Sequence, residues 1–457
     1  MSEDNRDYDV IVVGGGPAGV SVAYGLAKQG KSVIILDKKS HDQIGNKTCG
    51  DALDKSSPEF LYEEFGLPLP SGDEVSDHLT KLSVQTPSTT VTLTAPGYTV
   101  DRHIYGQRLL KECEEAGVVV VDQAPVREVL IENNYVVGVT YIDRQKREKV
   151  ELRAPLVADC SGTFGAIRQH LPDDFAEGIH PRIPDHHIAA TYREIVEMTE
   201  NHPYPSEIVL SYAPSIPPPG YLWFFTKGDK KLNIGTGWLK SENYEFEKSM
   251  KEIYRDALDE IYREGEDYEI LVKGGGQIPI RPPFDSLVFN GGVLIGDAGC
   301  LVDPTTAEGH GIALVAGAYA AKTMAAALDK EDYSRESLWK YNVDVMSHYG
   351  RRNSISYVTL QYLRAIEAEG MDFILKRNLL TEAEIKAVFN GENPKMGFKD
   401  ILVKIVRAFP NFKMLYKLYE LSRDVKAIGA IYDDYPDNPD DLTAWRHRRD
   451  EFLNEEL

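Results

Sequence analysis

The sequence predicts an α/β protein in which a parallel-sheet domain is interrupted by a mixed-sheet domain and followed by a helical region. An apolar strand pattern at 10–13 leads through glycines into a helical pattern at 20–29. Further apolar strand patterns at 156–158 and 292–295 are followed directly by Asp or Gly, and strand patterns crowd the stretch between them, from about 180 to 285. The 457 residues allow two or three domains.

The first strand, turn and helix carry the residues of a dinucleotide-binding βαβ unit. Gly14 permits the tight turn, Gly16 lets a pyrophosphate approach the backbone, and Gly19 lets helix and strand pack closely. A second strand pattern, at 33–36, leads into Asp37, whose carboxylate can accept hydrogen bonds from ribose hydroxyls. The predicted contacts of this unit are Gly14, Gly16, Pro17, Ala18, Gly19, Asp37 and Lys38.

Composition excludes several classes of protein. The net charge of −21 argues against a nucleic-acid partner. The four cysteines are scattered without a C-x-x-C pair, so neither a zinc site nor an iron–sulfur cluster is supported and we expect no metal. The N-terminus has no apolar signal region, and the alanine-rich run 312–328 is interpreted as a helix packed inside the protein. We therefore expect a cytoplasmic protein.

Between the strand patterns of the first domain we expect a short helix within 53–70, strand structure at 79–98, a helix at 105–116, a strand at 118–121 and a hairpin at 126–141. The inserted domain has strand patterns at 188–192, 207–212, 220–225 and 232–237 and a helix at 245–263. The small-residue helix starts near Gly309, and the chain is mostly helical from Ser334. The expected domains are 1–180 with 286–333, from which the strands at 79–100 are free to join the second domain, then 181–285, then 334–457.

One part of the helical tail differs in charge from the rest. Residues 395–426 hold eight Lys or Arg against three Asp or Glu. Apolar residues within this segment follow the spacing of an amphipathic helix, namely Phe398, Ile401, Leu402, Ile405, Val406 and Phe409. Two interpretations remain open: packing against the body of the protein, or peripheral contact with the inner face of a membrane.

Three glycine and acid signatures together resemble the flavoprotein group that includes p-hydroxybenzoate hydroxylase. They are Gly14 to Asp37, Asp159 with Gly162, and Gly296-Asp297 followed by Gly309 and Gly311. The resemblance implies a Rossmann-type FAD-binding domain in which Asp297 holds the ribitol and a helix N-terminus approaches the flavin ring. It also implies cofactor contacts from Asp159, Gly162, Asp297, Gly309, Gly311, Ile312, Arg108 on the 105–116 helix, and Val126 at the adenine.

The chain has no second strand, G-x-G-x-x-G and helix unit. A separate nicotinamide domain is therefore not expected. The predicted electron donor is NAD(P)H visiting the flavin site, or reduced ferredoxin.

Two further motifs are similar to those of the geranylgeranyl reductase family. The first is Lys47-Thr48-Cys49-Gly50-Asp51-Ala52, and the second is Tyr221-Leu222-Trp223-Phe224-Phe225-Thr226-Lys227 followed by Gly235-Thr236-Gly237. The resemblance to the archaeal members runs across almost the whole chain. Thr48 and Thr226 each stand where the family has a proline.

The resemblance implies saturation of the C=C bonds of geranylgeranyl chains in archaeal-type ether phospholipids. An isolated alkene is a poor hydride acceptor, so a plausible route adds a proton and takes hydride from flavin N5 in a dry apolar tunnel. Tyr221 and Trp223 lie two apart on a strand and would point toward that tunnel. The candidate catalytic residues are Cys49, Tyr221 and Trp223. The candidate substrate contacts are Tyr221, Trp223, Gly235 and Gly237, and the loop contacts to FAD are Cys49, Gly50 and Ala52.

Several alternatives remain at this point. An aromatic monooxygenase of the p-hydroxybenzoate hydroxylase type would use the same fold with oxygen, and geranylgeranyl diphosphate or a geranylgeranylated pigment or quinone would present the same tail. A flavin-binding carrier without catalysis is the non-enzymatic alternative. The oligomeric state is not predicted.

Overall fold

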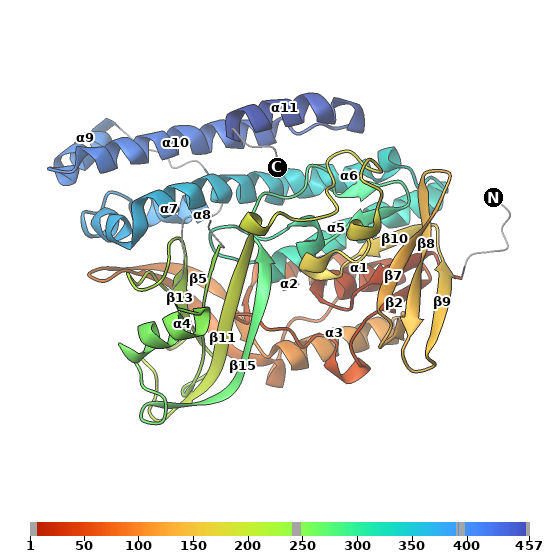
Figure 1. Cartoon of the computed structure of the whole chain (residues 1–457), viewed down its shortest axis with the longest axis horizontal. Helices are drawn as coiled ribbons and strands as arrows, with labels where there is room; N and C mark the ends of the chain where they lie inside the picture. The colour runs from red at the N-terminus through yellow and green to blue at the C-terminus, as the bar shows by residue number, and fades with distance from the viewer. Residues whose placement is uncertain (1–6, 240–247, 390–391, 393–397, 454–457) are drawn as a thin grey trace.

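The computed structural model describes residues 7–239, 248–389, 392 and 398–453. A six-stranded sheet forms one half of the molecule (Figure 1), and β1 lies at its centre between β10 and β2, parallel to both. The strand order is β16-β17-β10-β1-β2-β6, with only the β16–β17 pair antiparallel. The bounds are β1 Val10–Val13, β2 Val33–Leu36, β6 Val119–Val121, β10 Leu156–Asp159, β16 Val288–Phe289 and β17 Gly292–Leu294. The predicted Rossmann-type domain is confirmed.

Helix α1 (Pro17–Lys28) packs against both α5 (His310–Lys330) and α3 (Arg102–Glu115). Helix α2 (Ser56–Phe65) and helix α6 (Arg335–Val345) lie against α5. The short sheet β7 (Val126–Glu132), β8 (Tyr135–Asp143) and β9 (Glu148–Arg153) lies against β10. These layers enclose the main apolar core.

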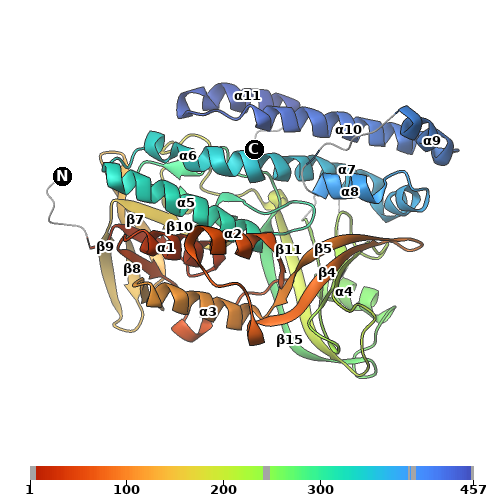
Figure 2. The same cartoon turned by 180° about the vertical axis from the view of Figure 1, so that it is seen from behind.

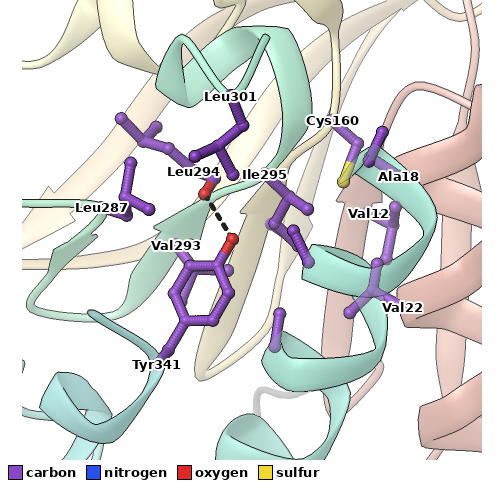
Figure 3. Packing of buried hydrophobic residues seen from close by; sticks show 14 of the residues in the cluster. Val12, Ala18, Val22, Cys160, Leu287, Val293, Leu294, Ile295, Leu301 and Tyr341 are labelled. Atoms are coloured by element: carbon purple, nitrogen blue, oxygen red, sulfur yellow. Dashed lines mark hydrogen bonds between the residues drawn. The ribbon is translucent and has the colours of Figure 1, made fainter. Parts of the chain in front are cut away.

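Figure 3 shows part of this core, in which side chains of β1, α1 and β17 meet. Val12, Val22 and Leu294 are fully buried. The hydroxyl of buried Tyr341, on α6, donates a hydrogen bond of 3.0 Å to the carbonyl of Leu294. The phenol thus completes the core without leaving a buried polar group unpaired.

Helix α5 is, among the described residues, the one helix long and apolar enough to cross a membrane, but 78% of its most apolar window is buried inside the protein. Gly317 lies so close to Ser21 of α1 that a Cβ would meet the serine Cβ at 2.7 Å. The small residues of α5 therefore serve close helix packing, as the sequence analysis expected.

The second half of the molecule is an eight-stranded sheet of order β15-β11-β14-β13-β12-β4-β5-β3. The strands at 75–85 and 90–100 belong to this sheet, with β12 and β4 parallel to each other. The bounds are β3 Ala52–Asp54, β4 Val75–Gln85, β5 Thr90–Val100, β11 Ile188–Met198, β12 Glu207–Ser211, β13 Tyr221–Thr226, β14 Lys231–Leu239 and β15 Tyr268–Pro279.

Four strands and a turn were not expected from the sequence. The predicted strand structure at 79–98 is a hairpin of β4 and β5, and β3, β9, β15 and β16 were missed. β15 is an edge strand, mostly exposed and interrupted by Gly274–Gly276, so it lacks both an apolar run and a clear alternation. The predicted helix at 245–263 is α4 (Met250–Asp259), and its residues 245–247 lie outside the described residues.

The C-terminal part is helical, as predicted. A π-helical turn, Met346–Gly350, joins α6 to α7 (Arg351–Lys376), followed by α8 (Glu382–Phe389), α9 (Phe398–Ala408), α10 (Phe412–Asp433) and α11 (Leu442–Leu453). Helix α10 packs along α7. Figure 2 shows α9, α10 and α11 as the outermost layer of the molecule.

Candidate active site

The turn after β1 is shaped for a group that approaches its backbone. Gly14 has φ +102°, and a Cβ there would meet the carbonyl oxygen of Cys160 at 2.6 Å. A Cβ on Gly19 would collide with the carbonyl of Gly14, whereas a Cβ on Gly16 would have no atom within 4 Å. Gly16 is the N-cap of α1 and offers no side-chain cap. The start of α1 therefore leaves room for a group to approach the backbone of Gly16, as a bound anion requires.

Asp37 is tied to the same turn. Its Oδ2 accepts a hydrogen bond of 2.8 Å from the Gly15 amide, and its Oδ1 accepts one of 2.8 Å from the Lys39 amide. The Lys38 side chain is exposed, and Val126 is buried at the start of β7. The structure thus brings Asp37 to the turn, while the cofactor contacts of Lys38 and Val126 stay predictions.

A small pocket lies at the glycine turn and is lined by Gly16, Arg102, Tyr105 and His310, among others. Arg102 and His310 are each 7% exposed. Both ring nitrogens of His310 are buried, and the ring lies next to the backbone of Ala52. Burial, reinforced by the positive charges of Arg102 and Lys47, holds the pKa of His310 well below its usual range. The turn therefore faces one buried cation and one neutral imidazole, neither of which the sequence analysis singled out.

Arg108, the arginine expected at the cofactor, is held elsewhere. Its Nε and Nη2 donate to the carboxylate of Glu74 at 3.0 and 3.1 Å, and its Nη1 donates to the carbonyl of Pro68. Glu74 is itself buried. The structure brings Arg102, six residues earlier on α3, to the pocket in its place.

The second acid of the predicted cofactor site, Asp297, lies in the turn Gly296–Gly299 after β17. Its Oδ2 is 2.9 Å from the Nζ of Lys47, which comes from the loop that carries Cys49. A Cβ on Gly309 would lie 3.4 Å from the Oδ1 of Asp297. Asp297, Gly309 and the loop of Lys47 therefore meet, and the contact of Asp297 with the ribitol stays a prediction.

Other predicted contacts have roles within the protein itself. The Oδ2 of Asp159 accepts from the amides of Ile167 and Arg168, at 2.9 Å each, and its Oδ1 accepts from the Ser161 hydroxyl, so this fully buried carboxylate organises its own loop. Gly162 has φ +79° in that loop, with open space around it. A Cβ on Gly311 would collide with Asp54, and Ile312 is buried in the core.

A charged cluster adjoins the turn that precedes α5. Arg352 donates 2.7 Å from Nη2 to the Oε2 of Glu308, and its Nε lies 3.3 Å from the Oδ2 of Asp303. Burial raises the pKa of Glu308 above its ordinary value, although Arg352 opposes the shift. Glu308 immediately precedes Gly309, so its carboxyl group lies beside the predicted ring-binding turn.

The aromatic and glycine residues of the second motif are paired across two strands. Tyr221 is opposite Gly237 and Trp223 is opposite Gly235 in the antiparallel β13–β14 pair. Tyr221 and Trp223 both belong to the apolar cluster formed with α7–α10, while Leu222 between them belongs to the cluster on the other side of the sheet. The prediction that Tyr221 and Trp223 share a face is confirmed.

A buried hydrogen-bond network joins this strand pair to the Cys49 loop. Asn233, fully buried on β14, accepts 3.0 Å from the Trp223 indole, and its amide donates 2.8 Å to the carbonyl of Cys49 and 2.9 Å to the carboxylate of Asp51. The Nζ of Lys227 lies 3.0 Å from the same Asp51 oxygen. Sequence reasoning missed Asn233, because a lone asparagine in a strand gives no periodic signal.

Cys49 is partly buried at the centre of these elements. The Asp51 amide donates to its sulfur at 3.1 Å, and Nη1 of Arg102 lies 3.6 Å from it. A Cβ on Gly50 would meet the ring of Phe225 at 2.7 Å, and Ala52 begins β3. The loop thus lies between the Arg102 pocket on one side and β13 on the other.

An apolar cavity of about 320 Å³ lies between the second sheet and helices α7–α10. Tyr212 and Thr305 line its inner part. The ring of Tyr212 lies 5.7 Å from that of Tyr221, whose hydroxyl donates 2.9 Å to the carbonyl of Thr306. Burial raises the pKa of Tyr221, so the phenol stays protonated and keeps this bond. Neither Tyr221 nor Trp223 lines the cavity itself, so their contact with a substrate stays a prediction.

Comparison with known proteins assigns both halves of the chain. Residues 9–165 match the family model for FAD dependent oxidoreductases, and residues 187–278 match the model for the geranylgeranyl reductase catalytic domain. The chain belongs to the FAD-dependent geranylgeranyl reductase family. The second match covers the strand pair of Tyr221 and Gly237, so an aromatic monooxygenase is not favoured for this reductase.

Named relatives span nearly all of the reductase. The digeranylgeranylglycerophospholipid reductase of Sulfolobus acidocaldarius is 29% identical over 453 residues, 98% of either chain. The digeranylgeranylglycerophospholipid reductase 1 of Methanococcoides burtonii is 28% identical over 424 residues, which are 91% of this chain and 95% of the relative. A geranylgeranyl bacteriochlorophyll reductase-like structure from Thermoplasma acidophilum superposes with a TM-score of 0.74 at 22% identity, covering 91% of this chain and 99% of that one. This last likeness shows the fold.

The geometry of the reductase fits FAD. The open space above Gly16 and the uncapped start of α1 suit the pyrophosphate, and buried Arg102 supplies positive charge beside it. Asp37 suits the adenosine ribose and Asp297 the ribitol. The cofactor assignment thus agrees with the donors and acceptors that the described residues present.

Proposed function

We propose that this reductase saturates the C=C bonds of geranylgeranyl chains in archaeal-type ether phospholipids. The observation that carries the proposal is the apolar cavity, which is lined mostly by aliphatic and aromatic side chains and reaches Thr305, within the turn of Asp303 to Gly309. Its volume of about 320 Å³ lies at the lower end of the range for small-molecule sites, roughly 300–1,000 Å³. Relatives that align over most of the chain carry the name digeranylgeranylglycerophospholipid reductase.

The chain must place an alkene, keep water away and supply a proton. FAD, when bound and reduced by the electron donor, would supply hydride at N5. The aliphatic lining of the cavity excludes water, and the buried ring of Tyr212, which lines the cavity, can stabilise positive charge on the alkene carbon that does not receive the proton. One carbon of each double bond then gains a proton and the other a hydride.

Two groups are candidates for the proton source. Cys49 was singled out by its motif, and its sulfur accepts from the Asp51 amide and lies near Arg102. Glu308 is the second, because burial raises its pKa and it directly precedes the predicted ring-binding turn, while its Oε2 accepts from Arg352. Single-turnover rates of Cys49→Ala and Glu308→Gln measured against pH separate them. The variant of the true donor loses both the rate and its pH dependence, while the other variant retains the wild-type profile.

The electron donor and the site of action are part of the same proposal. Reduced ferredoxin or NAD(P)H is the donor, since the sequence holds a single dinucleotide-binding unit. The protein acts in the cytoplasm, peripherally at the inner face of the membrane. The basic segment 395–426 in an acidic protein supports that location.

The decisive experiment is anaerobic. The flavin is reduced with dithionite, a digeranylgeranylglyceryl phospholipid is added in detergent, and flavin absorbance and lipid mass are followed together. Reoxidation with the lipid mass rising in two-hydrogen steps is expected. A flavin that stays reduced until oxygen is admitted would overturn the proposal. Equal rates with geranylgeranyl diphosphate would overturn the choice of the phospholipid over the free diphosphate as substrate.

Two variants test whether the cavity takes the chain. Leu418→Trp places a bulky indole in the part of the lining that α10 contributes. Because the indole would fill space that the chain needs, kcat/KM is expected to fall at least about tenfold. Tyr62→Trp on α2, where the residue is 55% exposed and remote from the cavity, is the matched control and should keep the wild-type rate. Trp223→Ala should also slow reoxidation, because it removes the indole that Asn233 holds.

A further inference from the structure

The outer surface of α9 and α10 carries an unusual set of side chains for a strongly acidic chain. Val406 is 76% exposed and Tyr419 is 64% exposed, and neighbouring apolar and aromatic residues are also exposed. We call this surface the α9–α10 face, and it comprises Val403, Val406, Phe409, Phe412, Tyr416 and Tyr419 with the basic residues Arg407 and Lys413. Phe398, Ile401 and Leu402 of the predicted stripe lie outside the residues whose side chains are described. The described residues of the predicted stripe, Ile405, Val406 and Phe409, are all exposed.

The charge of the segment is divided between its two sides. Lys404 is turned inward, where its Nζ lies 2.5 Å from the Oε1 of Glu384 on α8. Arg407 and Lys413 are exposed on the outside. Because the whole chain carries a net charge of −21, this outward positive charge is a local property of the α9–α10 face. Such a face is complementary to an anionic surface.

The apolar cavity reaches this face. Ile405 and Tyr419 line the cavity and are also exposed to solvent, at 39% and 64%. The opposite part of the cavity is lined by Thr305 and Tyr212. The cavity therefore extends from the predicted ring-binding turn to the surface between α9 and α10.

We propose that the α9–α10 face docks on an anionic lipid bilayer, and that the isoprenoid chain enters the cavity past Ile405 and Tyr419 directly from that bilayer. The inference rests on the proposed function for the identity of the chain, while the docking itself does not. Exposed aromatic rings flanked by Arg and Lys are the residues that settle at a membrane interface. In Figures 1 and 2 α9 and α10 form an outer layer at one end of the molecule, so no other element stands between this layer and a flat surface.

Flotation with substrate-free vesicles tests the docking. The FAD-loaded enzyme should float with vesicles that contain phosphatidylglycerol, less with pure phosphatidylcholine, and less again at high salt. Val406→Ser/Phe412→Ser should lower the bound fraction at least about tenfold, and Arg407→Glu/Lys413→Glu should abolish the preference for phosphatidylglycerol. Tyr62→Ser and Lys111→Glu, exposed on α2 and α3, are the matched controls and should float as the wild type does.

The outcomes separate docking from catalysis. On detergent-dispersed substrate the two face variants should keep the wild-type rate, because none of the four residues lines the cavity; on vesicle-borne substrate they should lose it. Three flotation results would overturn the docking: a wild type that stays unbound, face variants that float normally, or control variants whose bound fraction falls as much as that of the face variants. Face variants that change only the sedimentation mass would also overturn it, because they would mark a contact between copies of the chain. A wild type that floats but leaves detergent-dispersed lipid unsaturated would instead overturn the proposed function.

Discussion

The indole of Trp223 lies over the backbone of Gly235, its partner across the β13–β14 pair, so closely that a Cβ on this glycine would collide with the ring. The carbonyl of Tyr192 on β11 lies 2.5 Å from the same Cβ position on the other side. The pairing of Trp223 with Gly235 in the second motif is thus a packing requirement. The ring needs the space that the glycine leaves.

Gly235→Ala is therefore expected to displace the Trp223 ring. Overpacking of this kind destabilises by about 1–3 kcal/mol, and the displaced ring should shift the tryptophan fluorescence and lower kcat/KM. Gly276→Ala on β15 is the control, because its Cβ would meet only Thr191 Oγ1, at 3.4 Å. Urea unfolding and emission spectra check the prediction, and equal effects of the two alanines would contradict it.

Lys227 and Asp51 form a buried ion pair whose side chains are 7% and 3% exposed. Lys227→Met leaves the Asp51 charge buried with Asn233 as its remaining side-chain partner among the contacts described above, and is expected to cost about 3–5 kcal/mol in the free energy of unfolding. Lys227→Met/Asp51→Asn removes both charges and should recover part of the loss. Chemical unfolding of the four proteins in a double-mutant cycle measures the coupling. A single-variant cost below about 1 kcal/mol would mean that water reaches the pair.

Replacing Arg102 and replacing Arg108 are expected to have different effects on FAD binding. Arg102→Met removes the buried cation of the glycine-turn pocket and is expected to weaken FAD binding roughly ten- to hundredfold. Arg108→Met instead leaves buried Glu74 without its bidentate partner, so it should lower stability more than FAD affinity. Titration of apoprotein with FAD, followed by flavin fluorescence, decides between them. Weaker binding in Arg108→Met alone would restore the sequence-based assignment.

The parallel sheet was predictable because its strands are buried on both faces. Such strands read as uninterrupted apolar runs, and the predicted bounds of β1 and β2 match the structure. The glycines at 14 and 19 were predictable for the same kind of reason, since backbone contact leaves no room for a side chain. Local chemistry therefore determines the cofactor half of the site.

The rest depends on tertiary contacts that no local pattern reports. The sequence analysis chose Arg108 from its motif context, but the buried Glu74 that captures it lies on a different element. Asn233 is important because it bonds Trp223, and His310 because it lies at the glycine turn. Only folding brings these partners together. The cavity is likewise built from four helices and a sheet. A cavity could be expected from the family resemblance, but the sequence did not show where it lies.

His310 makes stability depend on pH in a defined direction. Burial holds its pKa well below that of a free imidazole, near 6.5, so below pH 6.5 the unfolded chain binds a proton that the folded chain does not. The stabilising contribution of the neutral ring is complete above that pH and is lost as the pH falls toward the folded pKa, by up to about 1.4 kcal/mol per pH unit. Replacing the ring by an apolar side chain in His310→Leu removes this titration, so the free energy of unfolding of the FAD-saturated variant should fall less steeply between pH 6.5 and 5. Urea midpoints across that range measure the difference, and parallel profiles for wild type and variant would show that the imidazole is protonated in the folded enzyme.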